Sequence, residues 1–181
     1  KAKAFMGELL RVPEVIEKVL GTKEEIHRLA GCIINARDVF MIGRGLDYSI
    51  LLEGSLKLKE VSYIHSEAYA SGELKHGTIA LITEDTPVIA VVTQEKLKSK
   101  ELSNIREVQS RGARVVLLIK EGETLNEGRQ WSCVYRLPVM EDPFMVMPAS
   151  VVLQLIAYYV SLDKGLDVDK PRNLAKVVTV E

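Results

Sequence analysis

Three charged side chains share one face of a helix predicted between Asp47 and Glu60. Glu53, Lys57 and Glu60 are spaced i, i+4 and i+7, which places them on one helical face over roughly two turns. A carboxylate base beside a cation is what a proton transfer next to a carbonyl requires. A solvated face with two favourable ion pairs has the same spacing. The spacing therefore predicts either a proton-transfer site or a pair of surface contacts.

Two side chains elsewhere in the chain could complete such a site. His76 lies in a glycine-flanked loop and could move a hydroxyl proton. Lys176 lies in the C-terminal tail, and a lysine near another cation can become a nucleophile toward a carbonyl. Spacing alone favours an exposed loop histidine and an ordinary tail lysine. His65, within a predicted strand, is interpreted as a hydrogen-bonded core residue.

The turn Gly43-Arg44-Gly45 joins the apolar segment Asp38–Ile42 to this helix. Open α/β sheets bind ligands outside the carboxyl ends of their strands, often at the start of the following helix. A Gly-x-Gly after a strand is by itself only a weak signal for a phosphate loop. Asp47 is predicted to be the N-cap of the helix, where its carboxylate would accept from free backbone N–H groups.

The rest of the chain alternates short apolar runs with amphipathic helical segments. Strands are predicted at residues 38–42, 61–66, 87–93, 114–119 and 133–137, and helices at 1–20, 22–36, 47–60, 98–111 and 145–162. The first helix is expected to break near Pro13. Alternation of this kind predicts a doubly wound parallel sheet between two helical layers. We expect one domain, with N-terminal helices (1–36), an α/β core (37–166) and a C-terminal tail (167–181).

Composition narrows the classes of function. Among 181 residues, 47% are hydrophobic and 27% charged, which is typical of globular proteins. The net charge of −1 gives no support for a nucleic-acid or anionic-membrane partner. No apolar run appears long enough for a membrane span, and we expect a cytoplasmic protein. Cys32 and Cys133 are therefore predicted to be reduced and buried, and the three scattered histidines predict no metal site.

Three segments resemble the C-terminal sugar-isomerase (SIS) subdomain of the glucosamine-6-phosphate synthases, also called glutamine:fructose-6-phosphate amidotransferases. They are EGSLKLKE at residues 53–60, SGELKHG at 71–77 and PRNLAK at 171–176, the last followed by TVE at 179–181. The resemblance covers the chain from about Asp38 to Glu181. Three such motifs in this order are far more specific than the fold alone.

The resemblance implies a fold, a reaction and a role for each residue. The fold would be a three-layer αβα sandwich with a five-stranded parallel sheet, flavodoxin-like. The reaction would make glucosamine 6-phosphate from fructose 6-phosphate and glutamine-derived ammonia, without a cofactor, for amino-sugar synthesis. Glu60 would move the proton between C1 and C2, and Lys57 would stabilise charge on the reacting oxygens. His76 would open the sugar ring from the neighbouring subunit of a homodimer, and Lys176 would form an imine.

Glu53, on the same face, and the turn Gly43-Arg44-Gly45 would contact the substrate. The family also has a glutaminase domain and a first SIS subdomain with a hydroxyl-rich phosphate loop, and this chain shows neither. The segment Gln94-Glu95 does not replace that loop. Thr78 stands where the family usually has Pro, and Val177 where it has Ser, and neither change removes a chemical group. The expectation is an isomerase lobe with weak or no turnover alone.

Two other classes of function fit a SIS fold. A sugar-phosphate-binding module of a regulator would need a hydroxyl-rich phosphate loop and could dispense with Lys57, Glu60 and Lys176. An oligomerisation lobe would use the apolar helix at residues 145–162. The tail separates these readings, because a tail folded over the Glu60 face favours catalysis whereas a free tail favours a scaffold.

Overall fold

The computed structural model describes residues 2–125, 131 and 133–174. Five parallel strands form a single sheet in the order β2-β1-β3-β4-β5. The strands are β1 (Asp38–Gly43), β2 (His65–Ala70), β3 (Pro87–Val92), β4 (Arg114–Lys120) and β5 (Cys133–Leu137). The chain runs from β1 to β2 on one side and then returns to β3 on the other. The carboxyl ends of β1 and β3 therefore flank the point where the sheet changes direction.

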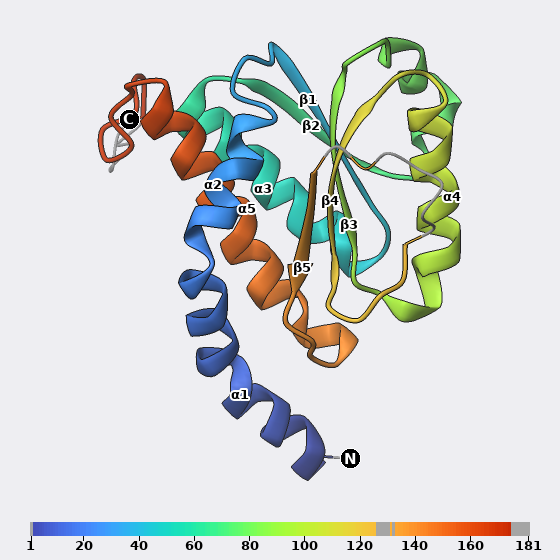
Figure 1. Cartoon of the computed structure of the whole chain (residues 1–181), viewed down its shortest axis with the longest axis vertical. Helices are drawn as coiled ribbons and strands as arrows, with labels where there is room; N and C mark the ends of the chain where they lie inside the picture. Colours follow the sequence, from blue (N-terminus) through green and yellow to red (C-terminus); the bar gives the residue numbers. More distant parts are fainter. Residues whose placement is uncertain (1, 126–130, 132, 175–181) are drawn as a thin grey trace, which may run out of the picture.

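Helices cover both faces of the sheet (Figure 1). One face carries α1 (Ala2–Gly21), α2 (Lys23–Gly31), α3 (Leu46–Ser62) and α5 (Val146–Asp163), and the other carries α4 (Lys98–Gln109). Four short 3-10 helices lie in the connections: η1 (Leu74–His76), η2 (Thr78–Leu81), η3 (Glu95–Leu97) and η4 (Asp142–Phe144). This arrangement confirms the predicted three-layer αβα sandwich with a five-stranded parallel sheet.

A separate hydrophobic core fills the space on each side of the sheet. The core under α3 and α5 includes Leu51, Leu58 and Leu153, all nearly inaccessible to solvent. The core under α4 includes Ile105 and also Leu74, which comes from the connection after β2. Strand β3 is buried along its whole length, because both of its faces are covered by helices. The connection that carries Leu74 thus belongs to the α4 side of the molecule.

The second strand differs from its prediction. Residues Val61 and Ser62 continue α3, and β2 begins only at His65 and runs to Ala70. The helix ends where Tyr63 adopts a left-handed backbone conformation with φ of 60°. β2 lies at the edge of the sheet and is partly exposed, so its sequence lacks the apolar run of a central strand. His65 is exposed and bonds to Asp38, so its prediction as a core residue is wrong.

Helix boundaries also differ at three places. Gly45, not Asp47, is the N-cap of α3, and the carboxylate of Asp47 is buried inside the fold. Helix α1 continues through Pro13 without a break, and α2 ends at Gly31, before the predicted limit. The N-cap prediction for Asp47 fails because Thr93, distant in sequence, supplies its hydrogen-bond donors.

The two cysteines form a disulfide, so the prediction of reduced cysteines is wrong. The bond joins Cys32, just after α2, to Cys133, the first residue of β5, across a sequence separation of 101. Helix α2 packs beside β5, which brings the two sulfur atoms together. A pairing of this kind depends on the tertiary fold and is invisible in the spacing of the residues.

The segment Asp142–Asp163, which contains α5, is long and apolar enough to cross a membrane, contrary to the sequence expectation. Half of its most apolar window is buried inside the fold, where α5 packs against α3. The apolar character of α5 is therefore accounted for by its place in the larger core.

Candidate active site

The charged face of α3 brings its three predicted residues together. The Nζ atom of Lys57 donates to Oε2 of Glu60 at 2.7 Å and lies 3.5 Å from Oε1 of Glu53. The side chains of Lys57 and Glu60 are 33% and 28% exposed, and that of Glu53 is 49% exposed. The cluster thus lies at the protein surface, where a substrate or another chain can reach it.

Close packing around the rest of α3 fixes which way this face points. A Cβ atom at Gly54 would lie 2.8 Å from Cδ1 of Leu153, so α3 and α5 approach more closely than a larger residue would permit. Ser55 is buried and donates to the backbone carbonyl of Ser66 in β2 at 2.8 Å. These contacts hold α3 in one rotation about its axis, and the charged face is left toward solvent.

The two carboxylates favour the charged form of Lys57. The hydrogen bond to Glu60 and the negative charges of Glu60 and Glu53 raise the pKa of Lys57 above its ordinary value. The ammonium group therefore remains protonated at neutral pH and can donate hydrogen bonds to a developing oxyanion. A nucleophilic lysine needs the opposite shift, so the raised pKa of Lys57 favours an electrostatic role over a nucleophilic one.

The described part of the tail returns to the same end of α3. The backbone N–H of Arg172 donates to the hydroxyl of Tyr63 at 2.8 Å, and its guanidinium lies 4.1 Å from the centre of the Tyr63 ring. Tyr63 follows α3 directly, three residues after Glu60. No sequence pattern indicated this pair, although Arg172 stands within the segment PRNLAK at residues 171–176. Lys176, the predicted imine-forming residue, lies outside the described residues.

His76 lies far from this cluster within one chain. It is exposed at the end of η1, two residues after Leu74, which is buried in the core under α4. Glu60 lies on the other face of the sheet, in the last turns of α3 and level with the start of β2. The length of β2, at about 3.3 Å per residue, adds a separation of roughly 17 Å along the strands. The chain therefore does not bring His76 to Glu60.

The turn Gly43-Arg44-Gly45 also lies away from Lys57 and Glu60. It precedes the first turn of α3, and Leu46 and Glu60 are about 21 Å apart along the helix axis at 1.5 Å per residue. A Cβ atom at Gly43 would lie 2.9 Å from the backbone of Asp47, so glycine allows α3 to start close to β1. Arg44 donates to Oδ1 of Asn104 at 2.8 Å, turning its side chain toward α4.

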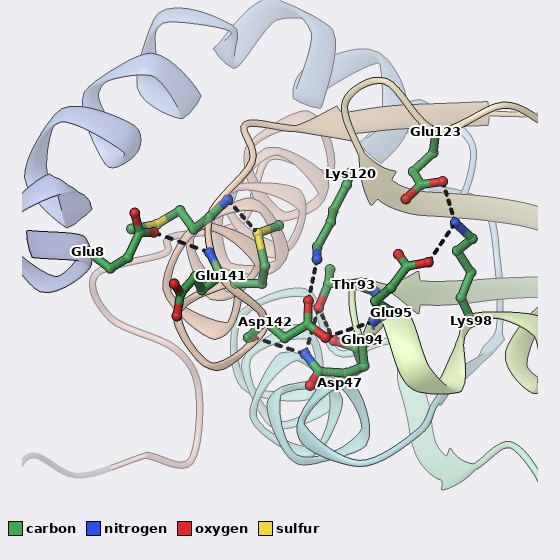
Figure 2. Close-up of polar contacts among 12 residues, drawn as sticks. Glu8, Asp47, Thr93, Gln94, Glu95, Lys98, Lys120, Glu123, Glu141 and Asp142 are labelled. Carbon is green, nitrogen blue, oxygen red and sulfur yellow. Dashed lines mark hydrogen bonds and ion pairs between the residues drawn. The ribbon is translucent and has the colours of Figure 1, made fainter. Parts of the chain in front are cut away.

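At the carboxyl ends of the central strands, side chains and backbone N–H groups bond to one another (Figure 2). Thr93 donates to the carboxylate of Asp47 through both its backbone N–H and its hydroxyl. The backbone N–H of Glu95 donates to Asp142, which also pairs with Lys120 at the end of β4. Burial raises the pKa of Asp47, opposed by these hydrogen bonds. The backbone N–H groups of Thr93 and Glu95 are thus already bonded within the chain.

Among residues 2–125, 131 and 133–174, no group of three or more His, Cys, Asp or Glu side chains is arranged to hold a metal ion.

The chain is similar over nearly its full length to known aminotransferases. The chain is 51% identical over its full length to a glutamine–fructose-6-phosphate aminotransferase (isomerizing) of Caldanaerobacter subterraneus. It is 53% identical over 96% of its length to the aminotransferase of the same name from Clostridium tetani. It covers 30% and 28% of those two proteins.

A solved structure, the C-terminal domain of the glucosamine-fructose-6-phosphate aminotransferase from Francisella tularensis, superposes with a TM-score of 0.84 and 36% identity. The match covers 92% of this chain and 47% of that one. The family model described as SIS domain matches residues 32–163, which include β1 to β5 and the charged face of α3. On these matches, the chain belongs to the SIS domain family.

Proposed function

We propose that this chain is the isomerase lobe of an enzyme that makes glucosamine 6-phosphate from fructose 6-phosphate and glutamine-derived ammonia. The observation that carries the proposal is the ammonium of Lys57 held between Glu53 and Glu60 on an accessible face of α3. The relatives at 51% and 53% identity, which are named for this reaction, support it.

The roles follow from charge and position. Glu60 takes a proton from C1 of the open-chain sugar and returns it to C2. Lys57, kept protonated by its two carboxylates, donates to the oxygen on which negative charge develops. Lys176 forms an imine with the ketose carbonyl, with loss of water. The docking of Arg172 on Tyr63 supports this role, because the tail is anchored at the Glu60 end of α3.

A complete site requires a second chain. His76 and Glu60 lie on opposite faces of the sheet and toward opposite ends of its strands, so a His76 that opens the sugar ring must come from another copy. Leu52 and Leu56, at i and i+4 on α3 and 48% and 43% exposed, flank the charged face with apolar surface. We infer a homodimer that covers this surface and shares its sites between chains.

The chain spans about 30% of the length of these relatives. We propose that the reaction also uses domains that correspond to their remaining length. A first SIS lobe would bind the sugar phosphate, and a glutaminase domain would release ammonia. The reaction uses no cofactor and takes place in the cytoplasm. Alone, the chain has weak or no turnover. A regulatory sugar-phosphate module is the less favoured candidate, because the donors at the carboxyl ends of β1 and β3 are already used by Asp47 and Asp142.

The proposal is tested by titrating the chain with fructose 6-phosphate and with glucosamine 6-phosphate while backbone amides are followed by NMR. We expect millimolar binding, with shifts at Lys57, Glu60 and Arg172 that are lost in Lys57→Met. Lys59→Met, which changes an exposed neighbour on the same helix, is the matched control. Unchanged spectra with both sugars contradict a preformed half-site. Synthesis of glucosamine 6-phosphate by the purified chain from fructose 6-phosphate and ammonia contradicts the inactivity of the lobe.

A further inference from the structure

A second polar cluster lies inside the protein, between the carboxyl end of β2 and helix α4. The hydroxyl of Ser71, directly after β2, donates to the carboxylate of Glu101 in α4, with Oγ–Oε distances of 2.7 and 2.6 Å. Nε of Arg44 lies 3.8 Å from Oε2 of Glu101. Ser71 and Glu101 are 1% and 2% exposed. A charged side chain so completely buried is uncommon unless its partners are provided.

This cluster ties three parts of the chain together. Arg44 belongs to the turn after β1, Ser71 opens the connection that carries His76, and Glu101 belongs to α4. The backbone N–H of Ser71 donates to the carbonyl of Gly43 at 3.0 Å. A Cβ atom at Gly72 would lie 2.8 Å from Nη2 of Arg44, so the connection rests directly on the guanidinium.

The same connection leads to His76 within five residues. The N–H of Glu73 donates to the carbonyl of Ala70 at 2.7 Å, and the N–H of His76 to the carbonyl of Glu73 at 3.0 Å. These two turns form one continuous hydrogen-bonded path from the end of β2 to His76. The orientation of that path is fixed at its start by Ser71, Gly72 and their partners.

We propose that Ser71, Glu101 and Arg44 are positioning residues that hold the connection carrying His76 against α4. The proposal rests on the function proposed above, in which His76 is presented to the site of a second chain. None of the three side chains lies on the charged face of α3, so they act through the placement of His76.

We call the contacts of Ser71 and Arg44 with Glu101 the clamp. The strength of the clamp depends on pH because Glu101 is buried. Burial raises the pKa of Glu101 to about 7, opposed by the Ser71 hydrogen bond and the charge of Arg44 and assisted by the negative charge of Asp47. Opening of the connection would return the carboxyl to water, where its ordinary pKa is about 4.5. The closed form therefore holds its proton more tightly than the open form. Closure is strongest below pH 4.5 and weakens as the pH rises to about 7.

Hydrogen exchange of the full chain tests this directly, without any sugar phosphate. We expect the protection factors of the Ser71, Glu73 and His76 amides to fall up to roughly tenfold per pH unit between pH 5 and 7 and to level off above. Amides in β3 report global opening, which also exposes Glu101 to water. Their protection should fall with the same profile but stay higher, which would show that the connection opens separately from the rest of the fold. In Glu101→Gln, whose side chain cannot ionise, the fall should disappear, while Glu107→Gln on the same helix should retain it.

Two further variants separate the titration of Glu101 from that of His76 and test the hydrogen bond of Ser71. His76→Asn excludes the titration of the histidine itself, and the pH profile should persist in it. Ser71→Ala keeps the carboxyl but removes its hydrogen-bond donor, so protection should fall several-fold at every pH. Protection that does not change with pH in the wild-type chain, or a profile that persists in Glu101→Gln, overturns the clamp. Either result leaves the proposed function intact, since that function is tested by sugar-phosphate binding at Lys57 and Glu60.

Discussion

Lys57 shows how a single side chain can be held in place yet contribute little to the fold. Its two carboxylate partners belong to the same helix and its surroundings are open to solvent. Ion pairs of this kind rarely stabilise a protein by more than about 1 kcal/mol, because water and salt screen them. The cluster is therefore expected to contribute little to the stability of the fold.

We predict that Lys57→Ala lowers the free energy of unfolding by less than about 1 kcal/mol. The change should be similar to that of Lys18→Ala, which removes another exposed pair, that with Glu14. Urea denaturation of both variants measures the difference. A loss several times larger in Lys57→Ala would show that the cluster supports the fold.

Gly43 illustrates a different requirement, that of close backbone approach. Gly43→Ala would place a methyl group 2.9 Å from the backbone of Asp47, and we predict a destabilisation of about 1–3 kcal/mol. Gly7→Ala is the matched control, since nothing lies within 4 Å of its Cβ position in α1. That change should be neutral or stabilise the protein by up to about 1 kcal/mol. Equal effects of the two substitutions would refute the packing argument.

Glu101 also makes the stability of the whole domain depend on pH. Its pKa is raised to about 7 in the folded chain from an ordinary 4.5, so folding takes up a proton between these values. The stabilisation is complete below pH 4.5 and is lost as the pH rises through 7, by about 1.4 kcal/mol per unit of pKa shift.

We therefore predict that the unfolding free energy of the wild-type chain falls by about 2–3 kcal/mol more than that of Glu101→Gln between pH 5 and pH 8. Denaturation at a series of pH values measures both curves. Parallel curves for the two proteins would contradict a raised pKa at Glu101.

At the scale of elements, the sequence best predicts those strands that helices cover on both faces of the sheet. β3 and β4 are continuous apolar runs and were predicted nearly to the residue, because central parallel strands have helices on both faces. β2 is an edge strand with polar residues, and its prediction was shifted toward the preceding helix. Local pattern could not reveal that Tyr63 ends α3 in a left-handed conformation.

Part of the candidate site could be predicted from local sequence, and part depends on the tertiary fold. Helical spacing was sufficient to group Glu53, Lys57 and Glu60, since three residues on one helix face need no tertiary information. The separation of His76 from Glu60 depends on which face of the sheet each connection covers. The contacts of Ser71 with Glu101 and of Cys32 with Cys133 join residues that only the folded chain brings together.

The contact between the tail and α3 gives a prediction for a whole segment. Tyr63→Phe keeps the ring beneath Arg172 but removes the hydroxyl that accepts its backbone N–H. We predict a local weakening of about 0.5–1.5 kcal/mol, seen as faster amide exchange at Arg172. Tyr158→Phe, at an exposed position of α5, is the control. Unchanged exchange at Arg172 in Tyr63→Phe would show that the hydroxyl does not hold the tail.

At the scale of the whole molecule, the sheet itself acts as a partition. The charged face of α3 and the loop that carries His76 lie on opposite sides of it, so in the proposed function each chain supplies halves of two different sites. A two-fold pairing of identical chains joins the complementary halves twice and closes, which leaves no free half-site.

Under the proposed pairing, the number of complete sites depends on the concentration of the chains as well as on the fold. When chains are dilute, doubling their concentration multiplies the paired sites about fourfold, because each site consumes two molecules. A single damaged copy would also disable a half in each of two sites. Under the proposed pairing, such a lobe would work only where its neighbours are abundant or physically tethered to it.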